Sequence, residues 1–163
     1  MYTPHDITLY NVYEDDNGDV QIGITVLRGV MLQNSKADNV NKSGLQNADS
    51  ATLFIPFSVS ATDVGNNSAV AGIAVVGKAI VGHGKTFLKP KAFKYSEDKE
   101  SHWTLVSQGT ESDHDCFFVK GVVIDKNGYA YMREHYDDVY KVTSVDIRDF
   151  GSYAMRHWQV GAR

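Results

Sequence analysis

Residues 136–163 read YDDVYKVTSVDIRDFGSYAMRHWQVGAR. They contain two strand-like runs, 139–150 and 153–160, which are joined by Gly151-Ser152 and continue almost to the last residue. The ends of a domain usually fray unless a sheet or a partner holds them. We therefore expect a closing β-hairpin of the core, with Trp158 buried in a sheet or pressed onto a partner.

The rest of the chain is also rich in strand patterns. Apolar side chains alternate over 20–32 and 51–59, and residues 116–124, CFFVKGVVI, have a strong strand pattern. An Asn17-Gly18 pair between two such runs predicts a tight hairpin. Only one short helix is expected, at 129–138. This pattern predicts an all-β fold, a small antiparallel β-barrel or sandwich with long loops, formed by residues 1–163 as a single domain.

Four positions predict local irregularities in this fold. Gly29 indicates a bulge or bend partway along a long strand, and a shift of strand phase predicts a second bulge near Thr143-Ser144. Pro56 lacks a backbone donor, so its strand is expected at an edge or a bulge. Pro90 is expected to break an irregular basic segment, 85–95.

Two segments are expected to lie outside the core. Residues 34–50 are polar and rich in Asn and Ser, which predicts a long mobile loop. Residues 61–86 are expected to form a loop or arm insertion, and within them the run 69–82 reads AVAGIAVVGKAIVG. This run is compatible with a thin hairpin of small side chains or with an extended arm that packs only against neighbouring molecules.

The composition narrows the classes of function. The net charge of −4 argues against a dedicated DNA-binding surface, which needs clustered Lys and Arg, although a mildly acidic channel wall would let DNA slide past. With Cys116 as the single cysteine, no intramolecular disulfide can form. The opening residues, MYTPHDITLY, have neither the basic nor the apolar region of a secretion signal, so secretion is not expected.

One motif suggests nucleotide binding. Residues 79–86, AIVGHGKT, match the loose form of a phosphate-binding loop with Ala in place of the first Gly. A functional loop of this kind needs a helix that starts at its lysine, and Pro90 would break such a helix. We therefore do not assign a nucleotide site.

No catalytic residue, metal site or cofactor is predicted. The six histidines form no tight ligand pair, and the closest cluster, His114-Asp115-Cys116, alternates across a strand. Nine tyrosines are present, and Tyr136 and Tyr140 belong to a cluster of them near the end of the chain. These tyrosines fit a protein interface and ordinary half-buried packing equally well.

Several blocks of the sequence together resemble a family. The blocks are DITLYNVYEDDNGD, TVLRGVMLQNSKADNVNKSGL, ADSATLFIPFSV, HWTL and the closing segment 136–163. As a set they resemble the head–tail connector proteins of tailed bacteriophages, in particular head-closure or stopper-like neck proteins. The resemblance covers most of the chain except about 61–86, where this chain is longer than the family pattern.

The resemblance implies a non-enzymatic structural protein of the virion, assembled in the cytoplasm of a host bacterium. Such a protein forms a homo-oligomeric ring in the neck and helps retain packaged DNA. Its implied partners are other copies of itself, a portal or adaptor ring above, and a tail terminator or tail tube below. Double-stranded DNA would pass through the channel without sequence recognition, and no membrane is involved.

Contacts within this assembly have named candidates. We expect Tyr136, Tyr140, His157, Trp158 and Arg163 to contribute to an interface with a neighbouring subunit or ring. An alternative within the particle is a tail terminator or tail-tube component. A more remote alternative is a small ligand-binding β-barrel, which would need a deep pocket with convergent polar groups.

Overall fold

The computed structural model describes residues 3–35, 38–41, 44–47, 50–63, 84–107 and 116–163. The strands in these ranges are β1 (His5–Glu14), β2 (Val20–Ser35), β3 (Asp38–Asn41), β4 (Gly44–Asn47), β5 (Ser50–Pro56), β6 (Ser60–Thr62), β7 (Thr86–Phe87), β8 (His102–Trp103), β9 (Cys116–Lys120), β10 (Val139–Arg148) and β11 (His157–Ala162). The helices are α1 (Pro90–Lys94), α2 (Tyr129–His135) and a short 3-10 turn, η1 (Tyr153–Met155).

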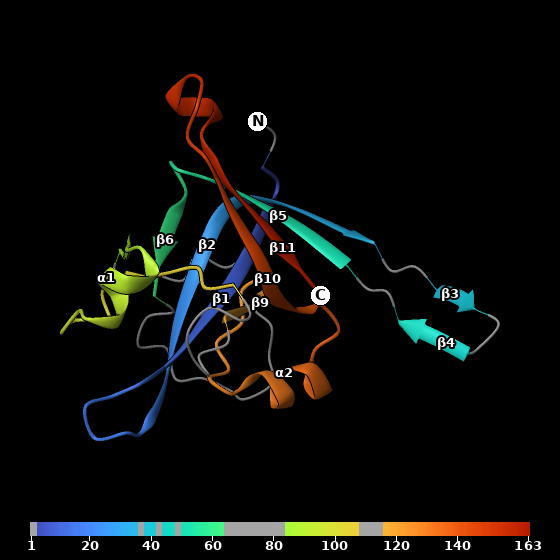
Figure 1. The fold of residues 1–163 in the computed structure, drawn as a ribbon, viewed down its shortest axis with the longest axis horizontal. Helices are drawn as coiled ribbons and strands as arrows, with labels where there is room; N and C mark the ends of the chain where they lie inside the picture. The colour runs from blue at the N-terminus through green and yellow to red at the C-terminus, as the bar shows by residue number, and fades with distance from the viewer. Residues whose placement is uncertain (1–2, 36–37, 42–43, 48–49, 64–83, 108–115) are drawn as a thin grey trace.

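A closed six-stranded antiparallel β-barrel forms the centre of the molecule (Figure 1). Its strands follow the order β1-β9-β10-β11-β5-β2, and the barrel closes because β2 also pairs with β1. With 16 residues, β2 is long enough to pair twice: residues 20–30 pair with β1, and residues 31–35 pair with β5. The predicted β-barrel is therefore confirmed.

Two bulges bend the long strands, and both were predicted. His5 pairs with Val30 and Asp6 with Arg28, so Gly29 is the extra residue, at a φ of +83° that glycine adopts without steric cost. In β10 the register shifts between Val142 and Ser144. A bulge increases the local bend and twist of a strand, which helps a sheet of this size to close on itself.

The interior of the barrel is filled by alternate side chains of its strands. Every second residue of β11 is buried, as are Leu53 and Ile55 of β5. Trp103 and Trp158 meet there edge to face, with ring centroids 5.4 Å apart. Because these alternating positions face inward, the period-two pattern of the sequence translates directly into the core.

A second apolar layer covers the outside of the barrel wall at β1 and β9. Phe117 stacks on Tyr10 with ring centroids 4.6 Å apart, and Met132 of α2 is fully buried against the same cluster. The first four residues of β9 are consequently buried whichever way they point. This arrangement explains why residues 116–119 are apolar at every position. The strand itself ends at Lys120, earlier than the predicted 124, and is followed by Gly121 at a φ of +87°.

The closing hairpin is confirmed, with one difference. β10 and β11 pair antiparallel from Val142 with Ala162 to Arg148 with His157. Residues 153–155, which we expected to be strand, form η1 instead. The second strand starts at His157, so the loop of this hairpin is longer than Gly151-Ser152 alone.

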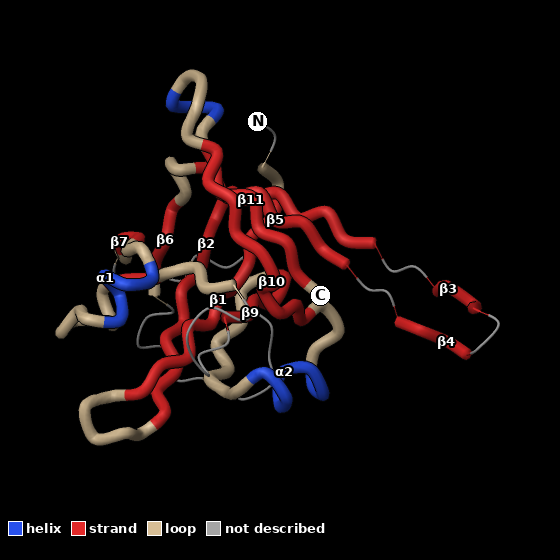
Figure 2. The backbone as a smooth tube through the Cα atoms, viewed as in Figure 1, coloured by secondary structure: helices blue, strands red, loops and turns tan. Residues whose placement is uncertain are grey.

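Two other predictions were wrong. Residues 34–50 are not a single long loop, because β2 extends to Ser35, β5 starts at Ser50, and β3 and β4 pair with each other between them (Figure 2). The strand with Pro56 is not at an edge, since β5 pairs with both β11 and β2. Pro56 is tolerated because it is the last residue of β5, beyond Phe54, which is the nearest residue to it that pairs with β2.

Candidate functional site

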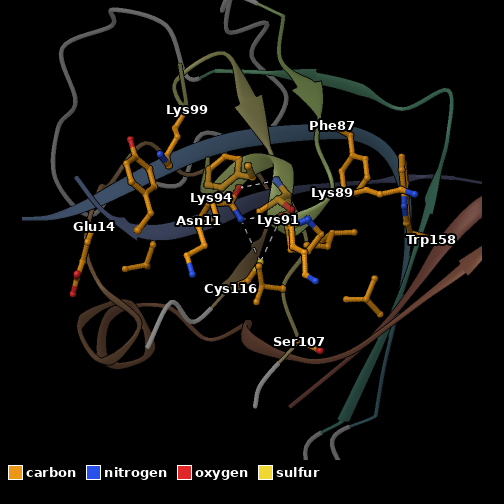
Figure 3. A pocket seen from close by; sticks show the side chains of 18 of the residues that line it. Asn11, Glu14, Phe87, Lys89, Lys91, Lys94, Lys99, Ser107, Cys116 and Trp158 are labelled. Atoms are coloured by element: carbon orange, nitrogen blue, oxygen red, sulfur yellow. Dashed lines mark hydrogen bonds between the residues drawn. The ribbon is translucent and has the colours of Figure 1, made fainter. Parts of the chain in front are cut away.

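A pocket of about 1040 Å³ opens at one end of the barrel (Figure 3). It lies between the end of β1, the second half of β10, the start of β11 and the segment that runs from β7 through α1. The segment 104–107, which follows β8, forms another side. Pockets of this size in β-barrels commonly hold a ligand or a side-chain cluster.

The walls of the pocket are mostly apolar. Phe87 and Trp158 pack against each other with ring centroids 4.6 Å apart and form part of one wall. Leu105, Val145 and Ile147 also line the cavity. Ile147 is 50% exposed although it sits on a strand of the barrel, because its side chain borders this open end. The pocket can therefore bury an apolar group.

A buried polar side chain holds the inner part of the pocket together. Asn11 Nδ2 donates a 2.8 Å hydrogen bond to the carbonyl of Thr104, and the amide of Thr104 donates to Asn11 Oδ1 at 3.3 Å. The side chain of Asn11 thus bonds the backbone of Thr104 as a neighbouring β-strand would. The Thr104 hydroxyl is also buried, and it makes no hydrogen bond within the described residues. Such a group lowers stability unless a water or ligand satisfies it.

The rim of the pocket carries charged side chains. The basic residues on it are Lys89, Lys91, Lys94 and Lys99, and the acidic residues are Glu14 and Asp15. Lys99 is partly committed, because its Nζ donates to the carbonyl of Ser96 at 2.8 Å and lies 5.6 Å from the ring centre of Tyr13. The rim therefore carries more positive than negative groups, around an opening whose walls are apolar.

Helix α1 places Lys91 and Lys94, its N-cap residue is Lys89, and its start corrects a prediction. Pro90 is the first residue of α1, where the missing backbone donor has no cost. It therefore begins a helix in this basic segment instead of breaking the chain. Phe93, the buried residue of α1, also lines the pocket and meets Tyr13 edge to face at 5.8 Å between ring centroids.

A separate polar cluster lies under α2 on the outside of the barrel. Tyr10 donates a 2.5 Å hydrogen bond from its hydroxyl to the carbonyl of Asp125, and Asn127 donates to the Asp125 carboxylate. Burial, reinforced by Tyr136 and Asp125, raises the pKa of Tyr10 well above its usual value. Burial and the Asp125 carboxylate also raise the pKa of Tyr136. The cluster fixes the connection between β9 and α2, which is a structural role.

The five predicted interface residues do not form one surface. Tyr140 and Trp158 are buried in the barrel, so neither contacts a partner directly while the barrel is closed. Tyr136 and His157 are half-buried, and Arg163 is exposed. The interface itself stays a prediction, and these positions show that Trp158 serves the core of the monomer.

The sequence reasoning missed the tip of the closing hairpin. Phe150, Tyr153 and Met155 are 67%, 61% and 65% exposed. They lie beyond the last strand pair, Arg148 with His157, at the end of the projecting hairpin in Figure 1. Three large apolar residues beside a Gly-Ser turn were a usable signal, because turns are normally polar.

The phosphate-loop match does not have the required local structure. Residues 79–83 lie outside the described ranges. Lys85 is followed by β7, whereas a phosphate-binding loop needs a helix at this point, and α1 begins only at Pro90. Lys85 Nζ instead donates a 2.8 Å hydrogen bond to the carbonyl of Ile24, and burial lowers the pKa of its amino group.

Two features are absent from the part of the chain that the structure describes. In that part, no three His, Cys, Asp or Glu side chains lie together in a way that could hold a metal ion. No helix in the same residues is long and apolar enough to cross a membrane.

Fold and pocket define a small closed β-barrel protein with an apolar opening at one end and a projecting apolar hairpin. The chain belongs to a family described as a family of unknown function (DUF6751), whose model matches residues 2–163. No curated protein and no solved structure matches the chain.

Proposed function

We propose that this protein is a structural protein of a tailed-phage virion. Copies of it form a ring in the neck that joins head to tail and helps to retain the packaged DNA, as a head-closure or stopper protein does. The observation that carries the proposal is the match between the blocks of family resemblance and the elements of the fold. The blocks cover β5, β8, β10 and β11 completely, β1 from Asp6 onward and β2 from Thr25 onward.

The segment that departs from the family pattern leaves this barrel intact. β6 ends at Thr62, and Thr62 forms an antiparallel bridge with Gly84. The chain therefore leaves and rejoins the described structure at one place. An insertion with this geometry is what a ring protein with an added arm would have.

The surface also supports assembly. Soluble monomers seldom keep several large apolar side chains exposed together, and such patches commonly mark contacts between proteins. The tip with Phe150, Tyr153 and Met155 is a patch of this kind. β3 and β4 pair only with each other among the described residues, and an isolated two-stranded hairpin is marginally stable in water. Contacts with a neighbouring subunit would stabilise both features.

The test is the location of the protein in purified phage particles. Mass spectrometry of gradient-purified virions should detect the chain at a fixed ratio to the portal protein, and electron microscopy with a tagged copy should place the tag in the neck. A capsid protein serves as positive control, and an abundant host cytoplasmic protein controls for contamination. Presence of the chain only in the lysate, and not in the particles, would refute the proposal.

The alternative position in the tail can be separated by the binding partner. A tail terminator or tail-tube component should co-purify with tails from a mutant that makes no heads. A head-closure protein should instead co-purify with filled heads from a mutant that makes no tails.

A second candidate function is a small ligand-binding barrel, which the 1040 Å³ pocket favours. Its apolar walls and basic rim would suit an apolar molecule with an anionic group. Native mass spectrometry of the purified chain tests this candidate, because a retained small molecule adds a discrete mass. A clean mass of the bare chain, combined with location in the neck, would reject it.

A further inference from the structure

We propose that the hairpin tip of one copy, residues 149–155, inserts into the barrel-end pocket of the next copy. This proposal rests on the proposed ring and deepens it, because it names the two surfaces that join neighbouring subunits. The tip and the pocket are different surfaces of one chain, so each copy would offer a tip to one neighbour and a pocket to the other. Contacts of this head-to-tail kind generate rings when the rotation between copies closes.

The tip is built to present its side chains outward. Met155 donates its amide to the carbonyl of Ser152 at 2.9 Å, and Gly151 takes a φ of +85°. Arg156 Nε donates to the carbonyl of Gly151 at 3.4 Å and ties the end of the turn to its start. These bonds hold a defined turn without help from the barrel. A preorganised surface loses little conformational entropy on binding.

The apolar area of the tip fits the centre of a contact. Phe150, Tyr153 and Met155 are each about two-thirds exposed, so together they offer roughly 400 Å² of mostly apolar surface. A stable interface buries about 800 Å² on each partner. The tip alone provides about half of this area, which is the share expected of an apolar core surrounded by a polar rim.

The pocket of the same molecule is not available to its own tip. Val145 and Ile147 line the pocket from β10, at the base of the hairpin, whereas the tip begins after Arg148. The large exposed fractions of the tip residues show that they do not fill the cavity of their own chain. A pocket that holds this tip must therefore belong to another molecule.

The charges around the two surfaces favour a second copy as that occupant. Lys89, Lys91 and Lys94 are exposed on the rim of the pocket. The approach to the tip carries two exposed carboxylates, Asp146 on β10 and Asp149 next to Phe150, whereas the two arginines that flank it, Arg148 and Arg156, are half-buried. Entry of the tip would bring these carboxylates toward the lysines, which adds favourable electrostatics at the edge of an apolar contact.

The experiment measures self-association of the full chain by sedimentation velocity from micromolar to millimolar concentration. The tip variant carries Phe150→Ser and Met155→Ser, and the rim variant carries Lys89→Glu and Lys91→Glu. All four positions are exposed, so circular dichroism and thermal melting should match the wild type. The variant Val20→Ser removes an equally exposed apolar side chain on the β1–β2 hairpin and serves as the matched control.

We expect the wild type and Val20→Ser to form the same oligomers. The tip and rim variants should each associate at least about thirtyfold more weakly, as for the loss of residues central to an interface. A mixture of the two variants is the decisive sample. In this mixture the rim variant supplies an intact tip and the tip variant supplies an intact pocket. One unaltered contact can therefore form between them, and association should stop at dimers.

Three results would overturn the proposal: a wild type that stays monomeric at millimolar concentration, tip or rim variants that associate like the wild type, or a mixture that associates no better than either variant alone. None of these results bears on whether the chain is present in the neck of purified particles. Failure of this contact is therefore distinguishable from failure of the proposed function.

Discussion

The backbone amide of Lys85 donates a 2.8 Å hydrogen bond to the carbonyl of Ala61. Together with the neighbouring bridge between Thr62 and Gly84, this bond joins the residues that precede and follow the segment 64–83. The strands before and after this segment are held by the barrel and by β8, and they need nothing from residues 64–83 to reach each other. The length of that segment is consequently independent of the barrel.

Replacing residues 64–83 by one glycine should leave the fold unchanged. The new junction, Asp63-Gly between Thr62 and Gly84, has the length and sequence of a two-residue hairpin turn. A shorter loop loses less entropy on closure, so the free energy of unfolding should stay constant or rise by up to about 2 kcal/mol. Urea denaturation measures it. A loss of more than about 2 kcal/mol would show that the segment, including the run 69–82, belongs to the core.

The Thr104 hydroxyl provides a test of the pocket. Because it is buried without a hydrogen bond in the described residues, Thr104→Val should raise the free energy of unfolding by up to about 1–2 kcal/mol. Thr25→Val is the matched control. The Thr25 hydroxyl is also buried without a hydrogen bond in the described residues, but Thr25 does not line the pocket. If Thr104→Val alone is destabilising, its hydroxyl binds a water or a ligand in the pocket.

The opposite result is expected for Asn11→Leu. This change removes both hydrogen bonds to Thr104 and leaves its buried backbone amide without a partner, while its carbonyl keeps only the weak 3.9 Å contact from Cys116 Sγ. The free energy of unfolding should fall by about 2–4 kcal/mol, measured by the same denaturation. A neutral result would mean that the segment after β8 does not depend on Asn11 to stay in place.

Much of the barrel could be predicted from the sequence because its strands obey local rules. The Asn-Gly turn, the glycine of the first bulge and the alternation in β5 and β11 each depend on a few neighbouring residues. The length of β9 could not be predicted in this way. Residues 116–119 are apolar at every position because Tyr10 and α2 cover the outer side of β9, and the contact with Tyr10 joins residues distant in the sequence.

The candidate site depends even more on distant contacts. The pocket combines the end of β1, helix α1 and the second half of β10, and no local pattern brings these together. Trp158 illustrates the difficulty, because an aromatic residue near a chain end fits an interface as well as a core. Its position between β10 and β5 was decided by the closure of the barrel, which leaves the exposed role to Phe150 and Tyr153.

Stability should fall at alkaline pH, and Tyr10 should account for part of the fall. Its pKa is raised from 10.0 in the folded protein, chiefly by burial, so the folded state keeps the phenol proton more tightly than the unfolded chain. Below pH 10 both states are protonated and Tyr10 has no effect on the pH dependence. Above pH 10 the unfolded chain loses this proton, and the free energy of unfolding falls by up to about 1.4 kcal/mol per pH unit.

The variant Tyr10→Phe isolates this contribution. It removes the hydrogen bond to Asp125, which should cost about 1 kcal/mol at neutral pH, but its stability should decline less steeply between about pH 10 and pH 11.5. Lys85 titrates in both proteins and cancels in the comparison, whereas Tyr136 is coupled to Tyr10 and contributes to the difference between the slopes. Urea denaturation over this range gives the two slopes, and equal slopes would show that the Tyr10 phenol is not protected in the folded state.

A chain that ends at Gly151 should not fold. The truncation removes β11, which pairs with β10 on one side and with β5 on the other, and with it the buried Trp158. Loss of this strand opens the barrel and exposes two new edges, so no cooperative thermal transition is expected. The milder change Trp158→Ala keeps the strand and should lower the free energy of unfolding by about 3–5 kcal/mol.

The matched control shortens the same hairpin without removing a strand. Replacing residues 149–156 by Asn-Gly joins Arg148 directly to its partner His157 through a two-residue turn. The barrel pairs stay complete, and the deleted apolar side chains are exposed, so this chain should melt cooperatively near the temperature of the full protein. If it also fails to fold, the tip stabilises the monomer. If the chain ending at Gly151 folds, β11 is dispensable and the barrel closes without it.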